Sequence, residues 1–207
     1  MPYSVATATT AVRQLLNEAS SSFWTDVEIS EWLAQATLDI TTTTRCLERT
    51  ATITAQNGDW DYALPAGIID TLGVVWLRTL QPLRKVSPSM LASESGPDVE
   101  ADRPTEWFEW NGVLYISRRP NATAHGNNLL VFYSLASNDF TLLSDLYQHL
   151  AIHYAVYRGK LKDKRFAEAG LLYAEYANGL GIRKLDIQQR TPHSEADLML
   201  PMSTVER

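Results

Sequence analysis

The sequence predicts an α+β protein in which both ends of the chain form an antiparallel helical bundle around an antiparallel, β-rich insert. Apolar residues recur at helical spacing near both ends, β-branched and aromatic residues dominate the middle, and 45% of the 207 residues are hydrophobic, enough to bury a core. We therefore expect one discontinuous helical domain of residues 1–48 and 138–187. The β-rich insert would span residues 49–137, and residues 188–207 would form a C-terminal arm.

Two helices are expected before the insert. Apolar residues follow helical spacing from Ala8 to Ala19, and three consecutive serines then interrupt the pattern. The second helix has a strong start, because Thr25 can cap it and Glu28, three residues later, can reach back to the cap. Residues 41–44 are β-branched threonines, which are weak helix formers, so the sequence does not fix the residue at which this helix ends.

Strands are expected through the middle of the chain. Asn57-Gly58 lies between two β-rich segments and predicts a hairpin of residues 51–55 and 60–64, and Asn111-Gly112 predicts a second tight turn. A short helix capped by Ser87 is expected at residues 86–91. The remaining expected strands are residues 69–77, 107–110, 113–117 and 128–135.

Two antiparallel helices are expected after the insert, with a break at residues 162–164. Gly179 and Gly181 weaken the continuity of the second helix. Tyrosines of the first helix are expected to pack against Tyr173 and Tyr176 of the second. The expected stripe of the first helix is Leu143, Leu146, Tyr147, Leu150, Tyr154, Tyr157 and Leu161, and that of the second is Phe166, Ala169, Tyr173, Tyr176, Ala177 and Leu180.

Charge is unevenly distributed along the chain, whose net charge is −6. Residues 87–111 carry six acidic groups and one basic group, whereas residues 158–182 carry five basic and three acidic groups. Segments of opposite charge can join neighbouring subunits or line a channel, although solvated loops are the alternative interpretation. The candidate inter-subunit or lumenal charges are Asp98, Glu100, Asp102, Lys160, Lys162, Lys164 and Arg165. The acidic balance disfavours a protein that grips duplex DNA.

No catalytic residues, metal ligands or cofactor are predicted. His149 and His153 share a helix face, and Asp145 lies one turn earlier, but the glutamate that would activate water beside the first histidine is absent. The single cysteine, Cys46, excludes an internal disulfide and is expected to be a passive thiol. No signal peptide or membrane-spanning segment is expected.

The order of the segments resembles the head-to-tail adaptor (connector) proteins of tailed bacteriophages, including those similar to tail tubular protein A. The residues that carry this resemblance begin with Phe23-Trp24-Thr25-Asp26-Val27-Glu28-Ile29 and Trp60-Asp61-Tyr62-Ala63-Leu64-Pro65. They continue with residues 81–91, Pro104-Thr105-Glu106-Trp107-Phe108, Gly112-Val113-Leu114-Tyr115-Ile116, Phe132-Tyr133 and a final helical pair. The similarity covers residues 8–182.

The resemblance implies a structural protein of the virion neck, made and assembled in the host cytoplasm, and not an enzyme. Such a protein would form a ring of its own copies beneath the portal protein, with twelvefold symmetry, and would bind tail or neck proteins on the other side. It would retain the packaged genome and let the genomic double-stranded DNA pass through its channel without sequence-specific binding. The C-terminal arm would bind the portal, with Leu198, Met199 and Leu200 as its anchors.

The residues leave two alternatives to a portal-binding adaptor open. A tail-completion or tail-platform protein would share this composition but would not bind the portal. A small metal-dependent hydrolase using Asp145, His149 and His153 is the one enzyme that the residues allow.

Overall fold

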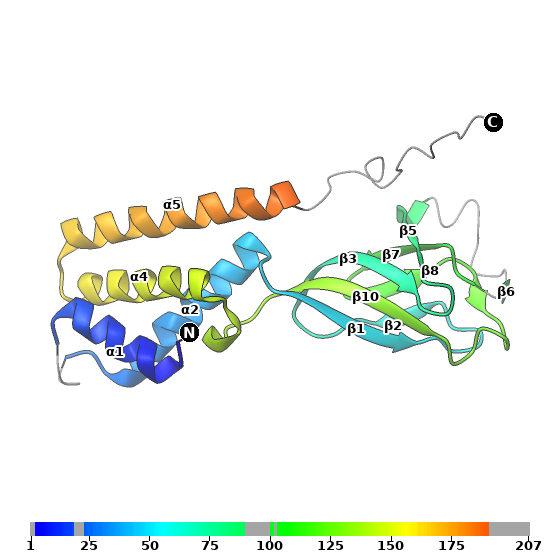
Figure 1. Cartoon of the computed structure of the whole chain (residues 1–207), viewed down its shortest axis with the longest axis horizontal. Coiled ribbons are helices and arrows are strands. Elements are labelled where there is room, and N and C mark those ends of the chain that lie inside the picture. Colours follow the sequence, from blue (N-terminus) through cyan, green and yellow to red (C-terminus); the bar gives the residue numbers. More distant parts are fainter. Residues whose placement is uncertain (1–2, 19–22, 90–99, 102, 191–207) are drawn as a thin grey trace, which may run out of the picture. The chain divides into compact units, whose positions relative to one another are not determined.

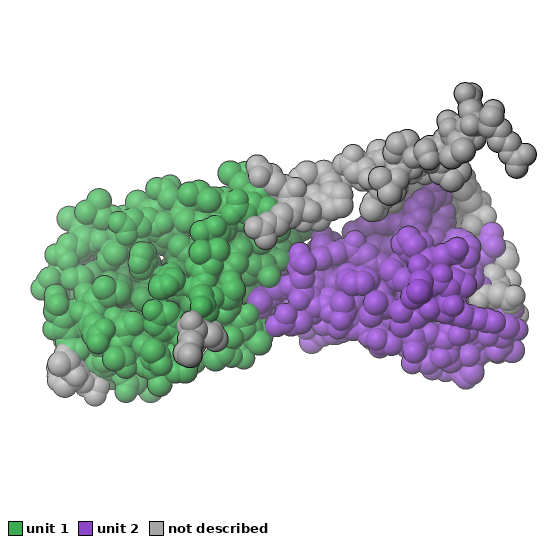
Figure 2. Space-filling model, viewed as in Figure 1, with its two compact units in different colours: residues 1–46, 137–207 green, residues 47–136 purple. Residues whose placement is uncertain are grey.

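A computed structural model describes residues 3–18, 23–89, 100–101 and 103–190, and confirms the predicted α+β class (Figure 1). The chain divides into two compact units (Figure 2). The helical unit comprises residues 1–46 and 137–207, and the β unit comprises residues 47–136. The chain therefore passes from one unit to the other at residues 46/47 and 136/137. The sequence predicted these boundaries at 48/49 and 137/138.

The helical unit begins with α1 (Val5–Leu16) and α2 (Asp26–Thr44). The capping box predicted for α2 is confirmed, because the Thr25 side chain accepts a hydrogen bond from the backbone of Glu28 and the Glu28 carboxylate accepts one from the backbone of Thr25. The threonines at the other end are helical as well, and their hydroxyls bond to carbonyls of the preceding turn, as Thr44 does to Ile40.

The second half of this unit consists of a 3-10 turn, η1 (Phe140–Leu142), followed by α4 (Asp145–Lys162) and α5 (Phe166–Arg190). The apolar stripe predicted for α4 is right in part. Leu143 is buried and Tyr147, Leu150 and Tyr154 pack against the core, whereas Leu146 is exposed and the most buried face of α4 lies beside the stripe. Helix α4 packs on two sides, with small side chains toward α1 and α2, and Tyr154 and Tyr157 toward Tyr176 and Tyr173 of α5. The buried residues of α4 are Gln148, Ala151, Ile152, Ala155, Val156, Gly159 and Lys160.

Helix α5 also departs from the prediction. It continues without a break through Gly179 and Gly181 to Arg190, so residues 188–190, predicted to belong to the arm, are helical. Gly179 serves a close helix contact, because a Cβ atom placed there would lie 2.5 Å from Cδ2 of Leu150 on α4. Phe166, predicted to pack, is exposed at the first turn. Residues 191–207 lie outside the described part of the chain.

Within its described residues the β unit contains two four-stranded sheets and one short pair of strands, antiparallel except for the β5–β7 and β6–β9 pairings. The first sheet has the order β1 (Glu48–Thr54), β10 (Asn128–Leu135), β3 (Ile68–Trp76) and β4 (Gln81–Pro82). The second has the order β2 (Asp61–Ala63), β8 (Val113–Ile116), β7 (Glu106–Trp110) and β5 (Arg84–Lys85). The short pair is β6 (Glu100–Ala101) with β9 (Arg119–Pro120).

The two sheets share one core, to which Trp76 and Val131 contribute from the first sheet and Trp107 and Leu114 from the second. All four side chains are buried. The predicted short helix is described only at Pro88 and Ser89, which are helical.

One predicted hairpin is confirmed and the other is wrong. Asn111 and Gly112 both have positive φ angles, and the turn that they form joins β7 to β8. At Asn57-Gly58 only the glycine has a positive φ, and the flanking strands enter different sheets: β1 pairs with β10, and β2 pairs with β8. A type I′ hairpin requires positive φ at both central residues, so this turn redirects the chain from one sheet to the other.

Candidate interaction surfaces

The predicted basic residues gather at the end of α4 and in the turn to α5. Lys160 forms an ion pair with Glu168 at 2.8 Å, and Lys162 forms one with Glu28 at 2.7 Å. Arg165 lies 2.7 Å from Asp163, while Lys164 is exposed in the turn with a positive φ. The structure therefore brings these cations together and pairs Lys160, Lys162 and Arg165 inside the chain.

The structure describes only one of the three predicted acidic residues. Asp98 and Asp102 lie outside the described residues, and Glu100 belongs to β6. The acidic residues that follow them are engaged within the β unit: Glu106 pairs with Arg84, and Glu109 accepts a hydrogen bond from the backbone of Thr71 at 3.1 Å.

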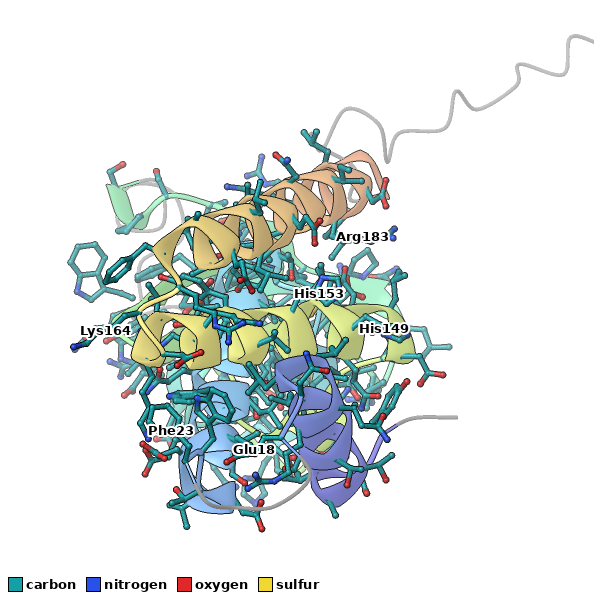
Figure 3. All side chains as sticks on the ribbon, turned by 90° about the vertical axis from the view of Figure 1, so that its left-hand side faces the viewer. Glu18, Phe23, His149, His153, Lys164 and Arg183 are labelled. Atoms are coloured by element: carbon teal, nitrogen blue, oxygen red, sulfur yellow. The ribbon has the colours of Figure 1, made fainter. Side chains whose placement is uncertain are left out.

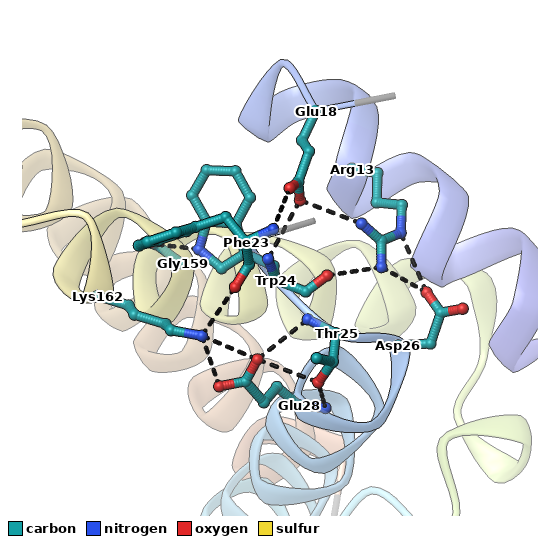
Figure 4. A network of polar contacts seen from close by, with 9 residues as sticks. All are labelled: Arg13, Glu18, Phe23, Trp24, Thr25, Asp26, Glu28, Gly159 and Lys162. Carbon is teal, nitrogen blue, oxygen red and sulfur yellow. Dashed lines mark hydrogen bonds and ion pairs between the residues drawn. The ribbon is translucent and has the colours of Figure 1, made fainter. Parts of the chain in front are cut away.

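A polar network ties the end of α1 to the start of α2 (Figure 4). The Arg13 guanidinium donates to the Asp26 carboxylate at 2.6 Å, to the Trp24 carbonyl at 2.7 Å and to Glu18 at 3.1 Å. Glu18 also accepts a hydrogen bond from the backbone of Phe23 at 2.6 Å. One nearly buried arginine thus fixes both ends of the connection between the helices.

The same network reaches the end of α4. The Lys162 ammonium donates to the Phe23 carbonyl at 2.9 Å and lies 5.0 Å from the centre of the Phe23 ring. The Trp24 indole donates to the Gly159 carbonyl at 3.2 Å, and Leu16 fills the space beside Gly159. Because these contacts join residues more than 130 positions apart, no local sequence pattern indicates them.

The Glu28 carboxylate makes the stability of this corner depend on pH. The hydrogen bond from Lys162, and then that from the Thr25 backbone, lower the pKa of Glu28 from 4.5 to about 2. A lowered pKa in the folded state stabilises the fold above pH 4.5, and this contribution is lost as the pH falls toward 2. The Glu28→Gln variant is therefore expected to lose less stability than the wild type between pH 4.5 and 2, as measured by urea unfolding at a series of pH values.

A matched control is Glu31→Gln, which removes an exposed carboxylate of the same helix. This control is expected to keep the wild-type pH dependence. Equal pH dependence of the wild type and Glu28→Gln would contradict the role assigned to Glu28.

Helix α5 presents an uncharged face to solvent. Between Phe166 and Ile187 only Ala169 and Tyr176 are buried, and Leu171 and Ile182 are 71% and 58% exposed. The residues on the opposite side from Ala169 and Tyr176, called the α5 face below, are Ala167, Gly170, Leu171, Ala174, Asn178, Gly181, Ile182 and Leu185.

A groove of about 360 Å³ lies beside this face within the helical unit. Its apolar lining comes from α1, α4 and α5, and four polar or charged side chains also line it. The lining residues are Leu15, His153, Val156, Lys160, Glu168, Leu171, Leu172 and Glu175.

Helix α2 has an exposed face of its own. Val27 and Leu38 are 67% and 46% exposed and lie on the side opposite the buried Ile29, Ala36 and Ile40. The residues of this side, called the α2 face below, are Val27, Glu31, Gln35, Leu38 and Thr42. Figure 3 shows α4 between α5 and α1. Helix α2 contacts both α4 and α5, and the Tyr176 hydroxyl of α5 donates to the Asp39 carboxylate of α2.

The histidines considered as metal ligands have other neighbours. The ring of His149 meets that of Tyr3 edge-to-face at 5.6 Å, and His153 lies 4.0 Å from Glu175 of α5 (Figure 3 labels both histidines). Within the described ranges, no three His, Cys, Asp or Glu side chains are close enough to share a metal ion. Burial raises the pKa of the Cys46 thiol, which lowers its reactivity.

The helices of the described chain include none with the length and apolar character needed to span a membrane.

Comparisons with known proteins agree with the segment order described above. A family model described as SU10 adaptor protein matches residues 3–198, nearly the whole chain. No curated protein matches. The family match covers the described parts of both units, so the resemblance to phage head-to-tail adaptors is confirmed. The chain therefore belongs to the SU10 adaptor protein family of phage head-to-tail adaptors, and it is a structural adaptor protein of the virion neck.

Proposed function

We propose that the protein forms a homo-oligomeric ring beneath the portal, retains the packaged genome and provides the platform to which the tail attaches. The observation that carries this proposal is the adaptor-family match over residues 3–198, which includes both units and the beginning of the C-terminal arm. An uncharged, exposed helix face such as that of α5 is also what a subunit of a ring needs.

The C-terminal arm is the proposed portal-binding element. Leu198, Met199 and Leu200 form a short apolar cluster in an otherwise polar segment, which suits insertion into an apolar groove of a partner. Deletion of residues 191–207 leaves every residue of α5 in place, since the helix ends at Arg190. Binding to purified cognate portal, measured by biolayer interferometry, is expected to weaken at least tenfold in this truncated protein. Unchanged binding would exclude the arm as the anchor.

Acidic residues are proposed to line the DNA channel. A negative wall repels phosphates, so that the duplex slides through without sticking. We expect that changing Asp98, Glu100 and Asp102 together to lysine slows genome ejection, because three new cations would hold the phosphate backbone. Ejection from purified particles can be followed with a DNA-binding dye. The control changes the same residues to Asn, Gln and Asn, and unchanged kinetics in the lysine variant would argue against a lumenal position.

The basic residues of the α4–α5 turn are the proposed counterpart of acidic groups on a neighbouring subunit. Lys160, Lys162 and Arg165 already have acidic partners within the chain, so they would act by sharing those partners. Lys164 is exposed in the turn and is the cation best placed to meet a neighbour.

A further inference from the structure

We infer that neighbouring subunits join head to tail, with the α5 face of one copy packed antiparallel on the α2 face of the next. This inference rests on the proposed ring and identifies the two surfaces that close it. A cyclic ring with head-to-tail contacts requires two different, complementary faces on each subunit.

The exposure of α5 is the first argument. A helix of 25 residues is about 37 Å long, and an isolated surface helix normally directs charged residues toward water. The α5 face instead directs leucine, isoleucine, alanine and glycine outward. Its small residues would allow the axis of a second helix to approach to the usual 8–10 Å. A second protein surface is therefore the expected environment of this face.

The positions of the two faces are the second argument. The α5 face lies opposite the residues that pack toward α4, and the α2 face lies opposite Ile29, Ala36 and Ile40, which are buried in the same core. Helices α2 and α5 contact each other through the hydrogen bond that the Tyr176 hydroxyl donates to the Asp39 carboxylate, and neither residue belongs to the α5 face or the α2 face. One copy can therefore use both faces at once, as each subunit of a ring must.

The spacing of the exposed apolar residues is the third argument. Leu171 and Ile182 are eleven residues apart, about 16 Å along the helix, and Val27 and Leu38 have the same separation. When the two helices pack with parallel or antiparallel axes, both residues of one pair can therefore contact both residues of the other. These contacts set the register of the two helices.

Charge decides between the two directions that this spacing allows. In the antiparallel register Val27 meets Ile182, and Asn178 lies level with Glu31. Lys184 then lies one residue from the level of Asp26, a carboxylate that pairs with Arg13 of its own chain but keeps 70% of its side chain exposed. In the parallel register Glu175 lies level with Glu31, and like charges repel. We therefore assign the antiparallel register.

Cysteine crosslinking on the cognate portal tests this assignment. In a Cys46→Ser background, the Val27→Cys/Ile182→Cys double variant is expected to give a ladder of covalent multimers on a non-reducing gel. The Val27→Cys/Leu171→Cys variant is the matched control for the parallel register and should give none, since a disulfide requires Cα atoms within about 7 Å. Multimers from the control alone, or covalent dimers from Leu171→Cys/Ile182→Cys, would overturn the proposed faces or register.

A charge variant provides a second measurement that needs no crosslink. Leu171→Glu is expected to retain the wild-type melting temperature and to weaken assembly on the portal at least tenfold. Leu80→Glu is the matched control, because Leu80 is similarly exposed, at 75%, but lies in the β unit. If the Cys46→Ser parent assembles on the portal and neither the ladder nor the Leu171 effect is seen, the faces are wrong and the proposed function stands. If the parent does not associate with the portal at all, the proposed function itself fails.

Discussion

Replacing Trp24 with alanine is expected to lower the free energy of unfolding of the helical unit by about 3–5 kcal/mol. Trp24 is buried in the core that α1, α2 and α4 share, where its removal leaves a cavity and takes away the indole donor to Gly159. The Gly159 carbonyl keeps a second hydrogen bond, from the backbone of Asp163, so most of the loss comes from packing. Urea unfolding followed by far-UV circular dichroism measures the change.

Phe23→Ala is the matched control for Trp24. Phe23 is the neighbouring aromatic residue and meets the Trp24 ring edge-to-face, but about half of its surface is exposed. Its loss is expected to cost less than about 2 kcal/mol. Equal costs at the two positions would contradict the burial on which the Trp24 prediction depends.

Trp107→Ala is expected to destabilise the β unit by a similar amount, about 3–5 kcal/mol. Trp107 is almost fully buried between the two sheets, its indole donates to the Leu83 carbonyl at 3.1 Å, and the Lys85 ammonium lies 5.0 Å from its ring. The alanine variant leaves a cavity and an unpaired buried carbonyl. Hydrogen exchange of the amides in β7 and β8 reports this loss locally.

Trp110 offers a control on the same strand. Its side chain is 65% exposed, so Trp110→Ala is expected to change the free energy of unfolding by less than about 1 kcal/mol. A loss at Trp110 as large as that at Trp107 would show that the core of this unit lies elsewhere.

Features set by adjacent residues could be predicted from the sequence. The capping box needs only Thr25 and Glu28, and the β7–β8 turn needs only Asn111 and Gly112, because the hydrogen bonds or φ angles involved are local. The run of aliphatic and aromatic residues from Leu129 to Tyr133 likewise places β10 within the chain as observed. The α+β class follows from the same patterns taken together.

Features that depend on distant partners could not be predicted. β1 pairs with β10 although β2 follows it directly, because strand pairing is decided by the core that both sheets share. Helix α5 continues through Gly179, and Leu150 of α4 occupies the space that a side chain at this position would fill. Helix propensity alone disfavours glycine at this position and predicts a weak helix. The close contact with α4 instead favours glycine, and the helix is continuous.

The same limit applies to the interaction surfaces. The cluster of basic residues is visible in the sequence, but the acidic partner of Lys162 is Glu28, 134 positions earlier, and only the fold brings them together. The stripe predicted for α5 included Phe166, whereas the structure exposes this residue. The uncharged residues of the α5 face recur at helical spacing in the sequence. Only the packing of α5 against α4 decides that this side of the helix faces solvent.

We propose that this adaptor binds the portal as a ring, and the mass of the complex decides whether it does. Purified protein mixed with its cognate portal and weighed by native mass spectrometry is expected to add about twelve subunits to each portal ring, as a ring matched to the symmetry of the portal requires. A portal that gains no mass at any ratio of the two proteins would exclude binding to the portal and would place the adaptor on the tail side of the neck.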